Sequence, residues 1–228
     1  NAIVFRYSPD AEGFYRMPWP SDGRTTPAGG PDLSDFPDRV GTLDIYLSAV
    51  EKVAGFATMP VAYFGLDEAL EEGVLPETLD TVSADSPVQL LDLSEAGCGR
   101  RYPLTIAQNA EGDRFHALHT LQIANAVGTI LEPGRPYGFV ILKSFGGAVG
   151  RHTPRPGAFD TALNTQAHLQ PLRDCAASGQ LDLNDVALAT VFTTQDPLAE
   201  MQALRDHVMN EDKVETRPLV RWGFSEAW

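Results

Sequence analysis

The stretch LHTLQIANAVGTILEPGRPYGFVILKSF, from Leu118 to Phe145, decides the fold that this sequence predicts. Two apolar runs rich in β-forming residues, 121–131 and 137–145, flank the segment EPGRP at 132–136. Proline presets φ for a turn and glycine supplies a positive φ, so this segment interrupts any strand. We therefore expect strand, turn and strand, with the two strands paired as an antiparallel hairpin.

The second run is almost continuously apolar from Tyr137 to Leu142. Such a run predicts a central strand that is buried on both faces. Further short apolar segments at 56–66, 88–93, 102–107 and 186–194 are separated by turn residues. Several short strands with turns between them are typical of an antiparallel β-sandwich of Ig-like type, so we expect a mainly β chain with peripheral helices.

Helices are expected near 43–54, 168–178 and 197–209. The first has an apolar face that includes Tyr46, Leu47 and Val50, a spacing that predicts packing against the core. In the second, Pro171 is tolerable only in the first turn. Asp196 and Pro197 together form a helix start for the third. Residues 146–164 contain several glycines and prolines and are expected to be loop.

This pattern divides the chain into three parts. Residues 1–41 are rich in proline and aromatic side chains, which predicts a loop-rich segment packed on the body of the protein. Residues 42–212 are expected to form the β-sandwich domain with its helices, and residues 213–228 a C-terminal segment leading into a further domain. An alternative role for the N-terminal aromatic residues is a ligand surface, with Tyr15 and Trp19 as its candidate contacts.

The charge balance argues against some partners. The chain has 17 Lys and Arg against 31 Asp and Glu, a net charge of -14, and its basic residues are scattered. Nucleic acid and anionic membrane surfaces need a basic face, so neither is expected as a partner. No apolar run approaches the roughly 20 residues that span a bilayer, so no transmembrane segment is expected.

A search for reactive motifs assigns no catalytic, cofactor-binding or metal-binding residue, and no cofactor is expected. The nucleophile motif G-x-S-x-G is absent, and the nearest candidates are Ser225, within Gly223–Ala227, and the loop serine Ser144. His116 and His119 have the spacing of a helical metal pair but adjoin a strand. The run at 182–185 (DLND) has some calcium-ligand character but lacks the glycine and glutamate of an EF-hand, so capping explains it better.

Cys98 and Cys175 are the only cysteines. A long-range disulfide is plausible if the protein is exported, and two free thiols are the equally simple alternative. Their separation does not match a CxxC metal or redox motif.

The order of segments resembles the N-terminal domain that precedes the α/β-hydrolase domain in exported bacterial lipases, the virulence-factor lipase type. The resemblance rests on the following motifs: Met17-Pro18-Trp19-Pro20-Ser21-Asp22; a helix before a strand that ends at Tyr63-Phe64; Leu131-Glu132-Pro133-Gly134-Arg135-Pro136-Tyr137; and Thr190–Gln195 before a helix. The turn at Pro133-Gly134 is also similar to that of bacterial Ig-like surface domains. The motifs are short, and the chain contains neither a lipobox leader nor a hydrolase part.

What this resemblance implies is a secreted or lipoprotein-anchored bacterial protein whose catalytic serine lies in a separate, following domain. We therefore expect a noncatalytic Ig-like accessory domain that stabilises a hydrolase domain of the same polypeptide or presents substrate to it. One alternative is a cell-surface module that binds protein, lipid or glycan. Another is an unrecognised small serine hydrolase that uses Ser144 or Ser225.

Overall fold

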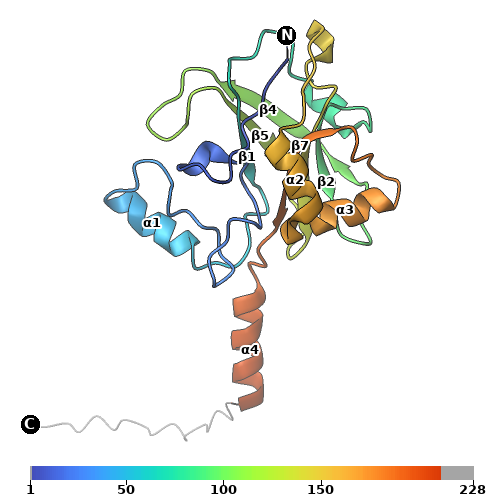
Figure 1. The fold of residues 1–228 in the computed structure, drawn as a ribbon. Helices are drawn as coiled ribbons and strands as arrows, with labels where there is room; N and C mark the ends of the chain where they lie inside the picture. Colours follow the sequence, from blue (N-terminus) through green and yellow to red (C-terminus); the bar gives the residue numbers. More distant parts are fainter. Residues whose placement is uncertain (1, 212–228) are drawn as a thin grey trace, which may run out of the picture. The chain divides into compact units, whose positions relative to one another are not determined.

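The computed structural model describes residues 2–211 and contains two antiparallel sheets (Figure 1). One sheet has the strand order β1-β5-β4 and the other β3-β2-β6-β7. Asn1–Asp196 forms one compact unit and Pro197–Trp228 a second, and each is described by itself. The strands are β1 Val61–Gly65, β2 Val88–Asp92, β3 Arg101–Tyr102, β4 Leu104–Asn109, β5 Thr120–Asn125, β6 Pro136–Leu142 and β7 Val186–Thr193.

Within the described residues, four α-helices and four short 3-10 turns accompany the strands. In the view of Figure 1, α1 lies to the left of the strands, α2 lies beside β7 and β2, and α3 lies to their lower right. Helix and strand make up nearly equal shares of residues 2–211, 25% and 23%, so the fold is mixed α/β and the expectation of a mainly β chain is wrong. The helices are α1 Thr42–Val50, α2 Gly157–Thr165, α3 Gln170–Ala177 and α4 Ala199–Glu211, with 3-10 turns at Phe14–Arg16, Thr78–Val82, Gly147–Val149 and Ala167–Leu169.

The expected hairpin between the two apolar runs is also wrong. Strand β5 pairs with β1 on one edge and β4 on the other, whereas β6 lies between β2 and β7. Because each strand has both edges occupied, the two have no edge left with which to pair. The segment between them crosses from one sheet to the other, held by bonds from the Leu131 amide to the Thr58 carbonyl (3.0 Å) and from the Glu132 amide to the Tyr137 hydroxyl (3.0 Å).

The expectation that 137–142 forms a central, fully buried strand is confirmed. Every residue of β6 after Pro136 is buried, and β7 is buried along all but its last residue. Both sheets contribute to one continuous hydrophobic core: Phe64 and Ile123 come from the first, Phe139 and Phe192 from the second. The rings of Phe139 and Phe192 stack at 5.5 Å across the β6–β7 pair, a geometry that adds to simple area burial.

The helix expectations have mixed outcomes. Helix α3 lies where it is expected, with Pro171 in its first turn, and α4 matches the third expected helix. Helix α2 falls in the stretch that is expected to be loop. Its buried residues Phe159, Ala162 and Leu163 have helical spacing, and this short apolar stripe outweighs the flanking glycine and prolines.

Helix α1 forms, but its expected packing in the core is wrong. None of its residues is buried, and Ile45 and Tyr46 are 70% and 68% exposed. Only Leu47 packs against a separate small cluster of Phe14, Tyr15 and Leu33. The apolar face of α1 therefore faces solvent. No helix of the described residues is long and apolar enough to cross a membrane.

A disulfide joins Cys98, in the loop after β2, to Cys175 in α3, with their Cα atoms 5.5 Å apart. The sequence leaves open a long-range disulfide and two free thiols, and the structure has the disulfide. The bond ties α3 to the edge of the four-stranded sheet across 77 positions of sequence.

Replacing both cysteines with serine should lower the free energy of unfolding by about 4 kcal/mol, because a crosslink across a long loop restricts the unfolded chain. Urea unfolding of the oxidised parent and of the double variant measures this difference. The parent treated with a reductant should unfold at the same urea concentration as the variant. An oxidised parent that unfolds no later than the variant would contradict the stabilising role of the bridge.

Candidate functional site

Residues Trp19–Asp22, which we call the clasp, connect the two sheets. The amide of Trp19 donates to the Tyr63 carbonyl (3.1 Å) and the Tyr63 amide donates back (2.8 Å), so the clasp pairs with β1 of the three-stranded sheet. Three positions later, the Asp22 amide donates to the Val191 carbonyl of β7 (2.8 Å). The Asp22 carboxylate accepts from both the amide and the hydroxyl of Thr193, each at 2.8 Å.

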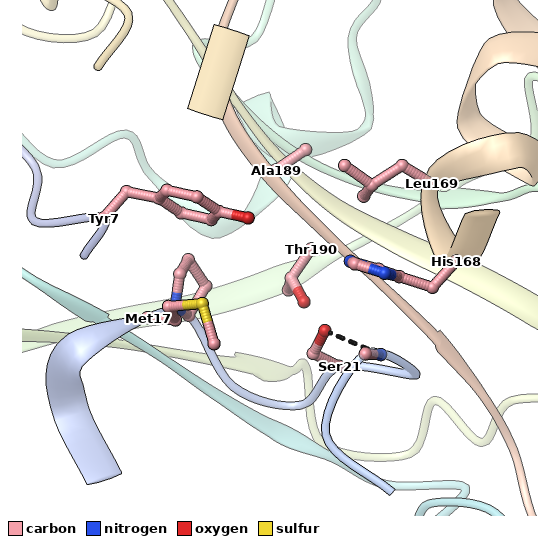
Figure 2. Close-up of a pocket in the computed structure, with 9 residues that line it drawn as sticks. Tyr7, Met17, Ser21, His168, Leu169, Ala189 and Thr190 are labelled. Atoms are coloured by element: carbon pink, nitrogen blue, oxygen red, sulfur yellow. Dashed lines mark hydrogen bonds between the residues drawn. The ribbon is translucent and has the colours of Figure 1, made fainter. Parts of the chain in front are cut away.

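A small cavity of about 30 Å³ lies behind the clasp (Figure 2). Figure 2 shows Tyr7 and Met17 on one side of it, the His168 ring on the other, and Ser21 below. A cavity of this volume holds about one or two water molecules. It is therefore too small for a substrate, and its polar groups serve the packing of the clasp.

The packing around the cavity is close. A Cβ atom at position 23 would lie 2.7 Å from Cε1 of His168, so only glycine fits beneath the imidazole without a shift. Ser21 uses its hydroxyl to accept from the Gly23 amide (3.2 Å), and Thr190 donates its hydroxyl to the Pro20 carbonyl. These contacts hold the clasp in place and leave the hydroxyl of Ser21 engaged with its own turn.

The pKa values of His168 and Asp22, two of the ionisable groups near the cavity, are shifted in opposite directions. Burial lowers the pKa of His168 below its usual 6.5, an effect that the nearby Asp22 carboxylate partly opposes. Burial likewise raises the pKa of Asp22, and the hydrogen bonds from Thr193 oppose that change. Both effects disfavour the charged form, because removal from water penalises ionisation.

Tyr15 and Trp19, the candidate contacts of the expected ligand surface, are buried and half-buried respectively. Tyr15 is 8% exposed, its ring packs edge-on against Tyr63, and its hydroxyl donates to the Phe115 carbonyl (2.7 Å). Burial raises the pKa of Tyr15 well above its usual value of 10. Trp19 is half-buried between the rings of Phe14 and Phe56. Packing of the N-terminal segment thus uses both residues, and each also lines a surface groove, Tyr15 beside Arg16 and Trp19 beside α1.

The remaining candidates lie apart from one another. Ser144 is an exposed residue after β6, and Ser225 lies outside the described residues. His116 is bonded to Asp113 (2.8 Å), which helps to hold the pKa of that carboxyl down to about 2, while His119 faces the Asp67 carbonyl (3.2 Å). Within residues 2–211, no group of three or more His, Cys, Asp or Glu side chains is placed to hold a metal ion.

The expectation that the run at 182–185 serves as a cap is confirmed for its first residue. The Asp182 carboxylate accepts from the Asn184 amide (2.8 Å), two positions along the chain. This is the local turn that an aspartate commonly stabilises.

A surface groove of about 360 Å³ lies beside α1 and the start of β1. Its lining contains no charged side chain, although the chain as a whole is strongly acidic. Val53 and Met59 are 46% and 53% exposed there, and the groove adjoins the exposed face of α1. The main lining residues are Trp19, Val50, Val53, Phe56, Met59 and Pro60. We call this the apolar groove.

No family model, curated protein or solved structure matches the chain. The clasp residues occur within the Met17–Asp22 motif, but no local pattern reveals which strands they join. His168 and the apolar groove have no sequence pattern that would have found them, because both depend on segments far apart in the chain.

His168 should make the protein less stable in acid. Between the lowered pKa of the folded state and the ordinary value of 6.5, the unfolded chain binds a proton that the folded chain does not, so stability falls as pH drops through this window. His168→Gln should remove this fall, and thermal unfolding from pH 8 to pH 5 measures it. If the melting temperatures of parent and variant fell in parallel with pH, His168 would have the same pKa in the folded and the unfolded state, which would contradict this prediction.

The Asp22 carboxylate acts in the opposite direction at lower pH. The pKa of Asp22 in the folded state is raised above 3.8. Its stabilising contribution to the free energy of unfolding is therefore fully present below pH 3.8 and is lost as the pH rises through the folded-state pKa. Burial, the largest cause of the Asp22 shift, is common to parent and His168→Gln, so the difference between their curves reports His168 together with its interaction with Asp22.

Proposed function

We propose that this chain is a noncatalytic accessory module, carried by a secreted or lipoprotein-anchored bacterial hydrolase, which docks on the hydrolase domain of the same polypeptide. The apolar groove is the observation that supports this proposal best. Its Val53 and Met59 side chains and the neighbouring Ile45 and Tyr46 of α1 are exposed, although they have apolar character. Apolar patches of this kind mark contact sites more often than free surface.

The chemistry of the groove fits a protein contact. Interface centres are depleted of charge and enriched in aromatic residues and methionine, and here Trp19, Phe56 and Met59 line a surface without charged groups. In a chain with a net charge of -14, such a surface is a local exception. Docking would bury the apolar face that α1 leaves in solvent.

The architecture is compatible with an Ig-like sandwich, which we propose as the finer description of the fold. Two antiparallel sheets with three and four strands share one core, and seven strands are the number in the constant-type Ig domain. The helices α2 and α3 would be additions to that scaffold. A stable sandwich suits a module that presents a surface rather than performs chemistry.

The same groove supports a second candidate, a surface module that binds a lipid or the apolar face of a glycan. Trp19 is the observation that favours it, because a half-buried indole at the groove wall offers a flat apolar surface. A third candidate is a small serine hydrolase with Ser144 or Ser225 as nucleophile, which fluorophosphonate labelling of the chain tests directly.

Val53→Glu should weaken the docking, because it places a charge in the uncharged lining of the groove. Val127→Glu is the matched control, since Val127 is 99% exposed and is not among the lining residues. In the polypeptide that contains this chain, we expect Val53→Glu to lower the melting temperature of the hydrolase domain by several degrees, a loss of about 1–2 kcal/mol. Differential scanning calorimetry of both variants measures this.

Two results would contradict the proposal. A reading frame that encodes no hydrolase domain beside this chain would remove the partner, and the binding module would then be preferred. Stoichiometric labelling of one serine of the folded 228-residue chain by a fluorophosphonate, with ester turnover, would show that the chain is itself catalytic.

A further inference from the structure

A second groove, of about 510 Å³, lies over the N-terminal segment and contains two arginine side chains, Arg6 and Arg16. The backbone holds the two arms of this segment together, because the Ser8 amide donates to the Arg16 carbonyl (2.9 Å). The volume lies in the range of small-molecule sites. The arginine groove is separate from the apolar groove, with which it shares no lining residue.

Both guanidinium groups are anchored at one end only. Arg6 donates from Nη2 to the carbonyls of Leu66 and Leu118, and Arg16 donates from Nη1 to the Ala11 carbonyl (2.6 Å). In the described part of the chain, the Nε of each arginine is buried and has no hydrogen-bond partner. Leaving a buried charged donor without an acceptor is unfavourable, so two such donors beside one groove require an explanation.

Neighbouring carboxylates do not supply the missing acceptors. Asp67 lies 3.8 Å from Nε of Arg6, and Asp35 lies 3.8 Å from Nη2 of Arg16, both beyond hydrogen-bonding distance. Asp35 is already engaged by the buried Arg24 at 2.9 Å. Glu12 also lines the groove and would compete with a bound anion, whereas more distant acidic residues are screened at physiological salt.

We propose that the arginine groove binds a small oxyanion, a carboxylate or phosphate group, between Arg6 and Arg16. An oxyanion has the paired oxygens that a guanidinium recognises through Nε and a terminal nitrogen. The proposed complex requires each side chain to rotate about its anchored end, so that the covered Nε donor reaches the bound anion. Binding then satisfies both donors with one ligand.

Titration of the intact 228-residue chain with sodium phosphate, and separately with sodium acetate, tests this proposal. The readout is the side-chain Nε–H resonances of ¹⁵N-labelled protein at pH 7 and constant ionic strength. Saturable shifts confined to Arg6 and Arg16 support the site. Saturation by phosphate alone identifies a phosphate ligand, by acetate alone a carboxylate ligand, and by both a general oxyanion site.

Arg16→Lys keeps the positive charge but removes the Nε donor, and it should weaken binding about tenfold, as loss of a charge-assisted hydrogen bond does. Arg100→Lys is the control, because the Arg100 side chain is 57% exposed and lies outside the groove. Unchanged backbone spectra confirm that both variants are folded.

Shifts that rise linearly with either anion, shifts of equal size at all arginines, or equal affinity in Arg16→Lys would each overturn the proposal. They would mean that Asp67 and Asp35 satisfy the two guanidinium groups in solution. None of these outcomes bears on docking at the apolar groove, which lacks both arginines.

Discussion

The structure depends on the way in which four residues of the N-terminal segment hold two sheets together. Trp19 pairs with Tyr63 of β1, and Asp22 bonds to Val191 and Thr193 of β7. These contacts cost little backbone freedom, because proline at position 20 already restricts the chain between them. A segment without regular secondary structure thereby becomes part of the protein's framework.

The clasp also explains how the exposed edges of the sheets are protected. Strand β7 ends its sheet, and an open edge invites pairing with other chains. Asp22 covers one end of that edge, while Arg155 donates from Nε to the Val186 carbonyl (2.8 Å) at the other. The apolar groove beside α1 and the arginine groove are two surfaces that remain open to other molecules, and the N-terminal aromatic residues form part of the lining of each.

Features that are determined by a short stretch of sequence could be predicted, whereas features that depend on contacts between distant segments could not. Local features were predictable: the buried strand β6 follows from its apolar run, and α3 from its spacing and the proline in its first turn. Strand partners were not, because β5 and β6 are each fully paired with strands elsewhere in the chain. The periodicity of α1 marked a helix correctly but could not show that its apolar face meets solvent. The apolar groove is assembled from distant segments, which no local pattern encodes.

Native-state hydrogen exchange of the Tyr63 and Thr193 amides tests the central role of the clasp most directly, since these amides donate to Trp19 and Asp22. If the clasp is part of the cooperative framework, both amides should open with nearly the same free energy as the amides of β6, which requires global unfolding. An opening free energy several kcal/mol lower at either amide would contradict this account, because the N-terminal segment would then detach while both sheets stay folded.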